Sequence, residues 1–414
     1  MPSCSCASRG PLFDNARRPG IKSPGTGYRG RDDPDERRCL IALHLVPALG
    51  PIRIARLVQA IGSARGACEA RETALAAVPG IGPRLAALIV RWRRAIDVDE
   101  ELRRASRAGA CVLTWLDADY PARLRELDDA PPVLYLRGSY RAREPAVAVV
   151  GTRSPSAYGL DVAGALGEVL GGAGVVVLSG LARGVDAAAH AGALRQGGST
   201  VAVLGCGVDV VYPREHRSLM EAMLARGGIV SEAPMGVPPR RQQFPLRNRL
   251  ISGLAQAVVV VEGGVDSGSL ITARHAARQG RPVYAVPGSV FAPGSRGPHR
   301  LLASGARVLG DPGELLQRLG VPHPARGGAE SAQPLSDDEA RVLRVLGEAP
   351  AHIDRVVERC GLGVGRVAGA LATLEVRGLV RQSPGKQFTR RSGFDGPGAQ
   401  HHPGGDLWPN HSSS

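Results

Sequence analysis

The chain carries VAVV at 147–150, VVVL at 175–178, TVAVL at 200–204, AVVVV at 257–261 and PVYAV at 282–286. A weaker apolar run lies at 228–231, and stretches rich in Ala and Leu separate the runs. Continuous apolar strands that alternate with helices are typical of a parallel sheet covered by helices on both faces. These residues therefore predict an α/β fold.

On the N-terminal side of these runs, residues 39–61 and 74–96 predict two helical pairs, each broken by a short turn rich in Gly and Pro. The second turn, VPGIGP at 78–83, is a candidate for a helix-hairpin-helix turn, whose backbone N–H groups bind a phosphate without reading base sequence. A scaffold that packs on the core is an equally good interpretation of this region.

On the C-terminal side, the sequence predicts a small separate unit. Ser336 and Glu339 match a capping box at the start of its first helix. The predicted elements are helices at 337–348, 353–360 and 364–377, a C-cap at Gly378, and strands at 379–381 and 387–389 around the turn Pro384-Gly385. Three short helices followed by a hairpin are typical of a winged helix.

The chain is thus expected to contain a disordered leader, a helical domain, the α/β core, a linker, a winged helix and a disordered tail. The predicted bounds of these six parts are 1–36, 37–112, 113–312, 313–335, 336–391 and 392–414. A winged helix often reads duplex DNA. Residues 313–414, however, hold 12 Lys and Arg against 11 Asp and Glu, and this near-neutrality favours a protein contact for that region.

Composition bounds the function only loosely. The 414 residues carry a formal net charge of +14, which is compatible with nucleic acid but also follows from a genome rich in G and C, whose codons favour Arg. An apolar content of 43% excludes wholesale disorder. We find no apolar run long enough for a membrane helix and no signal-peptide pattern, so we expect a cytoplasmic protein without membrane contact.

Several common cofactor motifs are absent from the sequence. Its seven cysteines include no CxxC pair, so neither a zinc site nor a disulfide framework is expected. Neither GxxxxGK[ST] nor GxGxxG occurs after a predicted strand. We therefore expect no metal and no cofactor.

Loops after the strands are the place to look for a site, because ligands of open parallel sheets bind outside the carboxyl ends of the strands. The first such loop, GTRSPSAYG at 151–159, combines small residues with Arg153, a cation suited to phosphate. The loop after the 257–261 strand contains Ser267, Gly268 and Ser269, which predict either an anion-binding nest or simple N-capping of the next helix.

Two candidates for catalytic residues lie in the loops between these. Asp186 and His190 are four apart and share a helix face, which suggests an acid–base pair, but a cap and a packing histidine are the favoured alternative because no third partner is evident. Cys206 lacks an obvious base nearby in sequence, so we expect a buried small residue rather than a nucleophile.

The stretch 233–261 contains no acidic residue. It holds Phe244 among four arginines, Arg240, Arg241, Arg247 and Arg249. Single-stranded nucleic acid requires cations along its phosphates and a ring on which a base stacks. The alternative is an ordinary basic surface with Phe244 in the core.

With these loops in view, the sequence resembles the DNA-processing protein A (DprA/Smf) family over roughly residues 113–310. The segments that carry the resemblance occur in the family's order: GTRSPSAYG, SGLARGVDAAAH, GCGVDVVYP, SEAP with FPLRNRLISGL, and SGSLITA. The resemblance implies an extended Rossmann-like, doubly wound core, with the family's helical (helix-hairpin-helix/SAM-like) N-terminal domain and C-terminal winged helix. One departure is His299, where the family usually has Asn.

The resemblance also implies a function without a catalytic residue: binding of single-stranded DNA in natural transformation, protection of the incoming strand, loading of the RecA recombinase, and self-association as a homodimer. Phe244 would be the base-stacking ring. The other residues that the family motifs place at the basic pocket are Arg153, Ser179, Gly180, Arg183, Arg241, Arg247 and Arg249, with Ser267 and Gly268 at its edge.

Two other classes of protein remain as alternatives. One is a nucleotide phosphoribohydrolase of the cytokinin-activating type, which shares the architecture, although its PGGxGTxxE signature is absent from this sequence. The other is a transcription regulator with a ligand-sensing core. The near-neutral winged helix argues against that regulator.

Overall fold

A computed structural model describes residues 33–142, 144–322 and 335–390, except for 348, 378 and 384. The chain forms two compact units, which divide after His323 and are described separately below. Most of the predicted leader, the tail, and the predicted cap Gly378 and turn residue Pro384 lie outside the described residues. The first helix begins at Pro34, inside the predicted leader, because Asp33 caps it and Pro34 suits its first turn.

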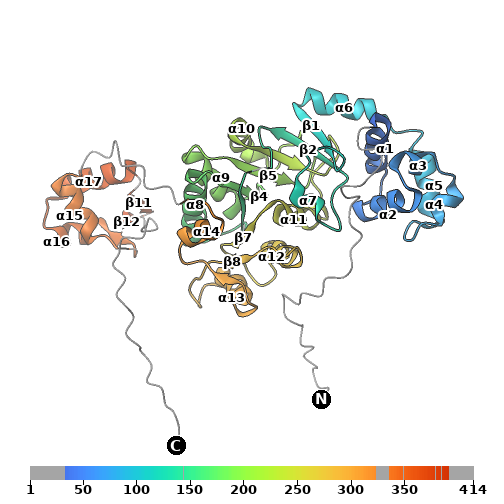
Figure 1. Cartoon of the computed structure of the whole chain (residues 1–414). Helices are drawn as coiled ribbons and strands as arrows, with labels where there is room; N and C mark the ends of the chain where they lie inside the picture. The colour runs from blue at the N-terminus through green and yellow to red at the C-terminus, as the bar shows by residue number, and fades with distance from the viewer. Residues whose placement is uncertain are drawn as a thin grey trace, which may run out of the picture. The chain divides into compact units, whose positions relative to one another are not determined.

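The first unit begins with a helical region and continues into the α/β core (Figure 1). The helices of the helical region are α1 (Pro34–Leu45), α2 (Pro51–Ile61), α3 (Ala64–Glu69), α4 (Glu72–Ala76), α5 (Gly82–Trp92) and α6 (Val98–Arg107). The strands of the core are β1 (Ala110–Thr114), β2 (Val133–Gly138), β3 (Ala146–Val150), β4 (Val176–Ser179), β5 (Thr200–Leu204), β6 (Gly228–Ser231), β7 (Ala257–Val260), β8 (Val283–Ala285) and β9 (Arg307–Val308). Its helices are α7 (Ala122–Arg125), α8 (Ala157–Gly172), α9 (Val185–Arg195), α10 (Arg217–Arg226), α11 (Gln243–Leu254), α12 (Gly268–Arg278), α13 (Arg296–Ala303) and α14 (Pro312–Arg318), with 3-10 turns at Arg214–His216 and Pro293–Ser295.

The nine strands form one sheet in the order β1-β2-β6-β5-β4-β3-β7-β8-β9. The strands from β6 to β9 pair in parallel, whereas β2 pairs antiparallel with both β6 and β1. The chain winds outward from β3 to β6 and then returns to add β7 on the other side of β3. The winding therefore reverses between β3 and β7, which is the topological switch point of a doubly wound sheet.

The central strands are buried on both faces, as their continuous apolar sequence predicts. Val147 and Val149 of β3 face a cluster with α8, α9 and α14, while the alternate residues of the strand face α11 and α12. The prediction of a parallel α/β sheet covered on both faces is confirmed. The linker predicted from residue 313 was placed too early, because Leu315 and Leu316 of α14 are buried in the core.

The helical region is held against the core by buried polar contacts as well as by apolar packing. His44 of α1 lies 2.8 Å from the carbonyl oxygen of Glu232, in the segment that connects β6 to α11. The carboxylate of Glu101 of α6 accepts hydrogen bonds from the backbone N–H of Met235 (2.9 Å) and from the hydroxyl of Tyr135 (2.7 Å). The helical region therefore fixes the segment between β6 and α11.

The second unit contains α15 (Asp337–Val345), β10 (Ala351–His352), α16 (Ile353–Cys360), α17 (Val364–Val376), β11 (Val380–Ser383) and β12 (Gln387–Arg390). Ser336 and Glu339 form the predicted capping box. The strand β10 was not predicted; it joins β12 to make a three-stranded sheet. Three helices with this hairpin make the predicted winged helix.

Among the described residues, no helix is long and apolar enough to cross a membrane. In the same part of the chain, no group of three or more His, Cys, Asp or Glu side chains is arranged to hold a metal ion.

Glycines set the distance between α8 and α9, which cover one face of the sheet. A Cβ atom on Gly192 would lie 2.1 Å from the carbonyl oxygen of Gly164, and one on Gly167 would lie 2.2 Å from that of Ala189. Because both obstacles are backbone atoms, a side chain at either position would force the helices apart.

We expect Gly192→Ala to lower the free energy of unfolding by about 1–3 kcal/mol, the usual cost of overpacking a core. Gly172→Ala is the matched control, because its Cβ would meet only the Gln196 side chain at 3.9 Å. The control should leave stability unchanged or raise it by up to about 1 kcal/mol, as alanine does in a helix. Chemical denaturation of both variants checks this, and equal stability would contradict the close packing.

Candidate functional site

The first turns of α11 contact two loops and one strand at the carboxyl edge of the sheet. Arg247 is 5% exposed, and its guanidinium donates to the carbonyl oxygen of Gly180 after β4 at 3.0 Å and to that of Val203 in β5. The next residue, Asn248, donates its amide to the carbonyl oxygen of Gly268 at 3.2 Å. One helical turn thus sets the positions of the loops that follow β4 and β7.

Electrostatics fixes the same arrangement. Asp186 accepts hydrogen bonds from the backbone N–H groups of Gly180 (3.1 Å) and Ala182 (3.3 Å). Burial raises the pKa of Asp186, and the positive charge of Arg247 opposes that rise. Burial lowers the pKa of Arg247 to about 10, so the guanidinium keeps its charge at neutral pH.

An aromatic pair lies at the start of α11. The rings of Phe244 and Tyr212 are 5.6 Å apart between centroids and tilted by 31°, and the guanidinium carbon of Arg153 lies 5.5 Å from the centre of the Phe244 ring. Phe244 is half-buried and Tyr212 is 38% exposed, so neither belongs to the core. Two side chains from separate loops, Arg153 and Tyr212, therefore meet the ring of Phe244 on α11 at the carboxyl edge.

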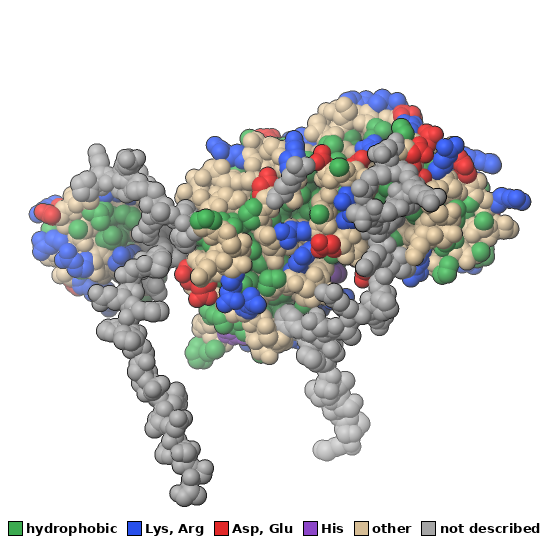
Figure 2. Space-filling model, in the orientation of Figure 1, with side chains coloured by type: hydrophobic (Ala, Val, Ile, Leu, Met, Phe, Trp, Pro, Cys, Tyr) green, Lys and Arg blue, Asp and Glu red, His purple; other side chains and the backbone are tan. Residues whose placement is uncertain are grey.

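Exposed arginines belong to the segments that carry or flank this aromatic pair in the chain. Arg153, Arg240 and Arg241 are exposed and form no ion pair with any residue that the structure describes. Arg183 is also exposed but pairs with Glu215. Over the face seen in Figure 2, basic side chains are scattered among acidic and apolar ones rather than gathered in one large patch. Local geometry, and not total charge, therefore distinguishes the site.

Arg249 lies inside the protein rather than at the aromatic pair. Its side chain is 6% exposed and forms ion pairs with Glu232 and with Asp129, the latter at 3.4 Å. It ties α11 to the segment after β6 and to the segment after α7. The predicted set thus divides into exposed arginines at the edge and two buried ones, Arg247 and Arg249, that hold the frame.

The switch point is closed by a side chain of the protein itself. Ser156 caps α8, and its backbone N–H and hydroxyl donate to the carboxylate of Glu262 at 2.9 and 2.6 Å. Glu262, two residues after the end of β7, is 4% exposed. Its backbone carbonyl also accepts from the N–H of Thr152 at 2.8 Å. The N-terminus of α8, where a Rossmann-like fold usually takes a phosphate, already has an anion.

The remaining predicted residues have structural contacts. Ser179 is buried and donates to the carbonyl oxygen of Val149 at 2.6 Å. Gly180 leaves room for Arg247, since a Cβ there would lie 2.5 Å from the guanidinium nitrogens. Ser267 caps α12, as the capping interpretation predicts, and a Cβ on Gly268 would meet nothing. His299 forms a structural contact as well, since its Nε2 lies 3.0 Å from the carbonyl oxygen of Gly288.

The two candidates for catalysis are buried. Thr200 donates its hydroxyl proton to the carbonyl of Val177 and therefore accepts from Nδ1 of His190, 2.6 Å away. Burial lowers the pKa of His190 to about 3, which keeps the ring neutral at neutral pH. Cys206 is 1% exposed, and burial raises the pKa of its thiol to about 11. Both side chains match the packing interpretation.

Three residues of this arrangement were not predicted for the site: Tyr212, Asn248 and Glu262. Tyr212 belongs to the GCGVDVVYP segment and Asn248 to FPLRNRLISGL. Their positions after strands or on the first turns of α11 were the available signal. Glu262 also follows a predicted strand, but only the fold shows that its carboxylate meets the start of α8.

The nine-stranded, mostly parallel sheet defines a Rossmann-like α/β protein, and the second unit adds a winged helix. The model of the family described as DNA recombination-mediator protein A matches residues 111–320, and that of the DprA winged helix domain matches 327–386. The chain belongs to this DprA/Smf family.

Relatives support this assignment over most of the chain. The Smf protein of Synechocystis is 34% identical over 394 residues, which cover 86% of this chain and 99% of the relative. The Smf protein of Escherichia coli is 41% identical over 276 residues, or 64% of this chain and 74% of the relative. The crystal structure of DNA processing protein A from Streptococcus pneumoniae is 33% identical, covers 68% of this chain and 97% of its own, and superposes with a TM-score of 0.60.

A pair of leucine variants separates the buried arginines from the exposed ones. Arg247→Leu should lower the free energy of unfolding by about 3 kcal/mol, because Asp186 and two carbonyl groups lose their buried partner. Arg153→Leu, at an exposed position, should leave the melting temperature unchanged. Thermal unfolding by circular dichroism measures both, and equal melting temperatures would show that Arg247 does not hold the loops together.

Proposed function

We propose that the protein binds single-stranded DNA at the carboxyl edge of its sheet, through the aromatic pair Phe244 and Tyr212 and the exposed arginines around it. The observation that carries the proposal is the meeting of Tyr212 and Arg153, from two separate loops, at the ring of Phe244 on α11, with distances to its centroid of 5.6 and 5.5 Å. Base stacking on an aromatic ring tolerates any sequence, and arginines bind the phosphates between bases. The membership of the family supports the same activity.

The arginines divide between two roles in this proposal. Arg153 and Arg241 are exposed and bind phosphates, and Arg183 does so by exchanging Glu215 for the DNA. Arg247 and Arg249 position the loops from inside and do not touch DNA. The DNA lies on loops whose shape depends on the small residues Ser179, Gly180, Ser267 and Gly268.

The structure favours this binding role over a phosphoribohydrolase. A nucleoside monophosphate bound at the switch point would place its phosphate near the start of α8, where the carboxylate of Glu262 would repel it. The buried neutral ring of His190 and the raised pKa of Cys206 offer no accessible base or nucleophile. We therefore propose a protein that is not an enzyme.

Binding to single-stranded oligonucleotides at several salt concentrations tests the proposal. Arg153→Ala and Arg241→Ala should each weaken binding and flatten the dependence of log affinity on log salt by about one unit, the effect of one lost phosphate contact. Phe244→Ala should weaken binding by about 1–3 kcal/mol without changing that slope. Fluorescence anisotropy gives both quantities.

Arg226→Ala is the matched control, because this exposed arginine directly precedes β6 and so lies at the opposite, amino edge of the sheet. It should bind single strands like the wild type. Equal affinity of the wild type and of Arg153→Ala, Arg241→Ala and Phe244→Ala would sink the proposed interface. Hydrolysis of nucleoside monophosphates would favour the enzyme instead.

Family membership further suggests that the protein acts in the cytoplasm as a homodimer that protects incoming single strands and loads RecA on them. Sedimentation equilibrium should then give twice the chain mass. Added protein should also shorten the lag of RecA assembly on single strands coated with single-strand-binding protein. A monomer, or an unchanged lag, would limit the function to DNA binding alone.

A further inference from the structure

A small hollow is lined by Gln243, the residue that directly precedes the proposed stacking ring Phe244. Its volume is about 120 Å³, and its walls come from the ends of β5 and β6 and from the first turns of α11. An engineered protein cavity of about 150 Å³ takes up a benzene ring. The hollow therefore has room on the order of one six-membered ring.

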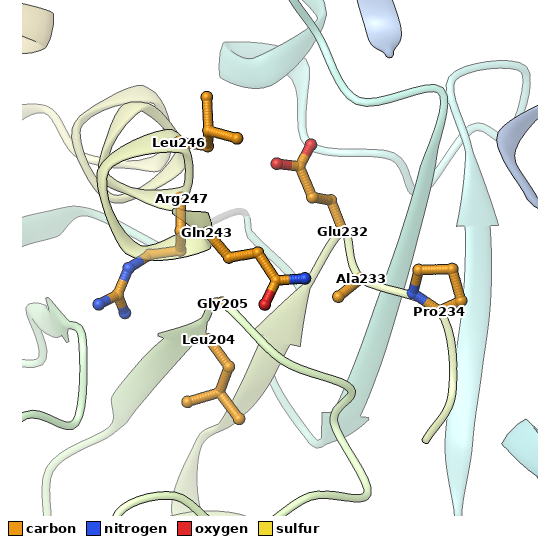
Figure 3. A pocket seen from close by; sticks show the side chains of 8 residues that line it. All are labelled: Leu204, Gly205, Glu232, Ala233, Pro234, Gln243, Leu246 and Arg247. Carbon is orange, nitrogen blue, oxygen red and sulfur yellow. The ribbon is translucent and has the colours of Figure 1, made fainter. Parts of the chain in front are cut away.

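Both apolar and polar groups line the hollow (Figure 3). Leu204, Ala233, Pro234 and Leu246 supply apolar surface, and Leu246 is 61% exposed at its rim. Glu232 and Gln243 supply one carboxylate and one amide. Flat apolar walls with a few polar groups suit a planar heterocycle rather than an ion.

The polar groups have defined hydrogen-bonding roles. The backbone N–H of Arg240 donates to Oε1 of Gln243 at 2.9 Å, so the amide nitrogen is the free end of that side chain. Figure 3 shows this nitrogen directed toward Ala233, across the hollow. Glu232 is only an acceptor while ionised, and Arg249 pairs with it. The hollow thus offers a donor and an acceptor at its polar side.

We propose that this hollow takes the base of one pyrimidine nucleotide, next to the base that stacks on Phe244; this inference rests on the proposed binding of single-stranded DNA. The mainly apolar walls and the free amide nitrogen of Gln243 suit a base better than a phosphate, although the Arg247 side chain also lines the hollow. Thymine presents an N–H between two carbonyls, and cytosine presents an amino group beside a ring nitrogen. Each edge gives one donor to Glu232 and one acceptor to Gln243. A purine carries a second ring and exceeds a space on the order of one six-membered ring.

The test compares oligonucleotides of about 12 nucleotides made only of dT, only of dC or only of dA, by fluorescence anisotropy. Gln243→Ala should weaken binding of the dT and dC strands about threefold to tenfold, the equivalent of one lost hydrogen bond, and leave dA binding unchanged. Gln243→Glu keeps the acceptor for Arg240 but removes the donor, so it should lose the same selectivity. Each affinity is expressed as a ratio to the affinity of the wild type for the same strand. The self-stacking of dA strands then cancels.

Gln242→Ala is the matched control, since this exposed neighbour does not line the hollow; all three strands should bind it like the wild type. Melting temperatures of the variants should equal that of the wild type. If Gln243→Ala weakens all strands equally, or none, the base pocket is refuted while the proposed function stands. If the wild type binds no single strand at all, the proposed function itself fails.

Discussion

The arrangement at the carboxyl edge depends on one buried charge, the guanidinium of Arg247. It lies among the carbonyl oxygens of Gly180 and Val203 and near the carboxylate of Asp186, which in turn holds the loop after β4. A buried cation is tolerated only where hydrogen bonds and an opposite charge offset its desolvation. Arg247 therefore couples the loop after β4 and the strand β5 to the start of α11.

The switch point of this Rossmann-like sheet is occupied by side chains of the protein itself. In such sheets the ligand usually lies at the switch point, against the N-terminus of a helix. Here Glu262 lies at that point, and its carboxylate binds Ser156. The exposed aromatic and basic groups lie instead at the start of α11. The fold is thus common, and the proposed site lies away from its usual place.

The sequence predicted the central strands well because they are buried on both faces and read as unbroken apolar runs. It did not predict β1, β2 or β9. The edge strands β1 and β9 lack that pattern, whereas β2 has a buried apolar run at 133–136 but pairs antiparallel, outside the regular alternation of strands and helices. The four arginines of 233–261 look alike in sequence, yet Arg247 and Arg249 are buried and Arg240 and Arg241 are exposed. Only tertiary packing on both sides of α11 separates them. Glu262 escaped prediction for a related reason, because its partner Ser156 is distant in the chain.

The contacts of His44 and Glu101 change what the helical region means for the rest of the chain. Both side chains form hydrogen bonds with the backbone of the segment from Glu232 to Met235, which forms one wall of the hollow beside α11. The domain boundary predicted at residue 112 therefore does not separate two independent parts of the structure. The helical region holds the segment after β6 in place from outside the sheet. The geometry of the proposed site therefore depends on the whole first unit and not on the α/β core alone.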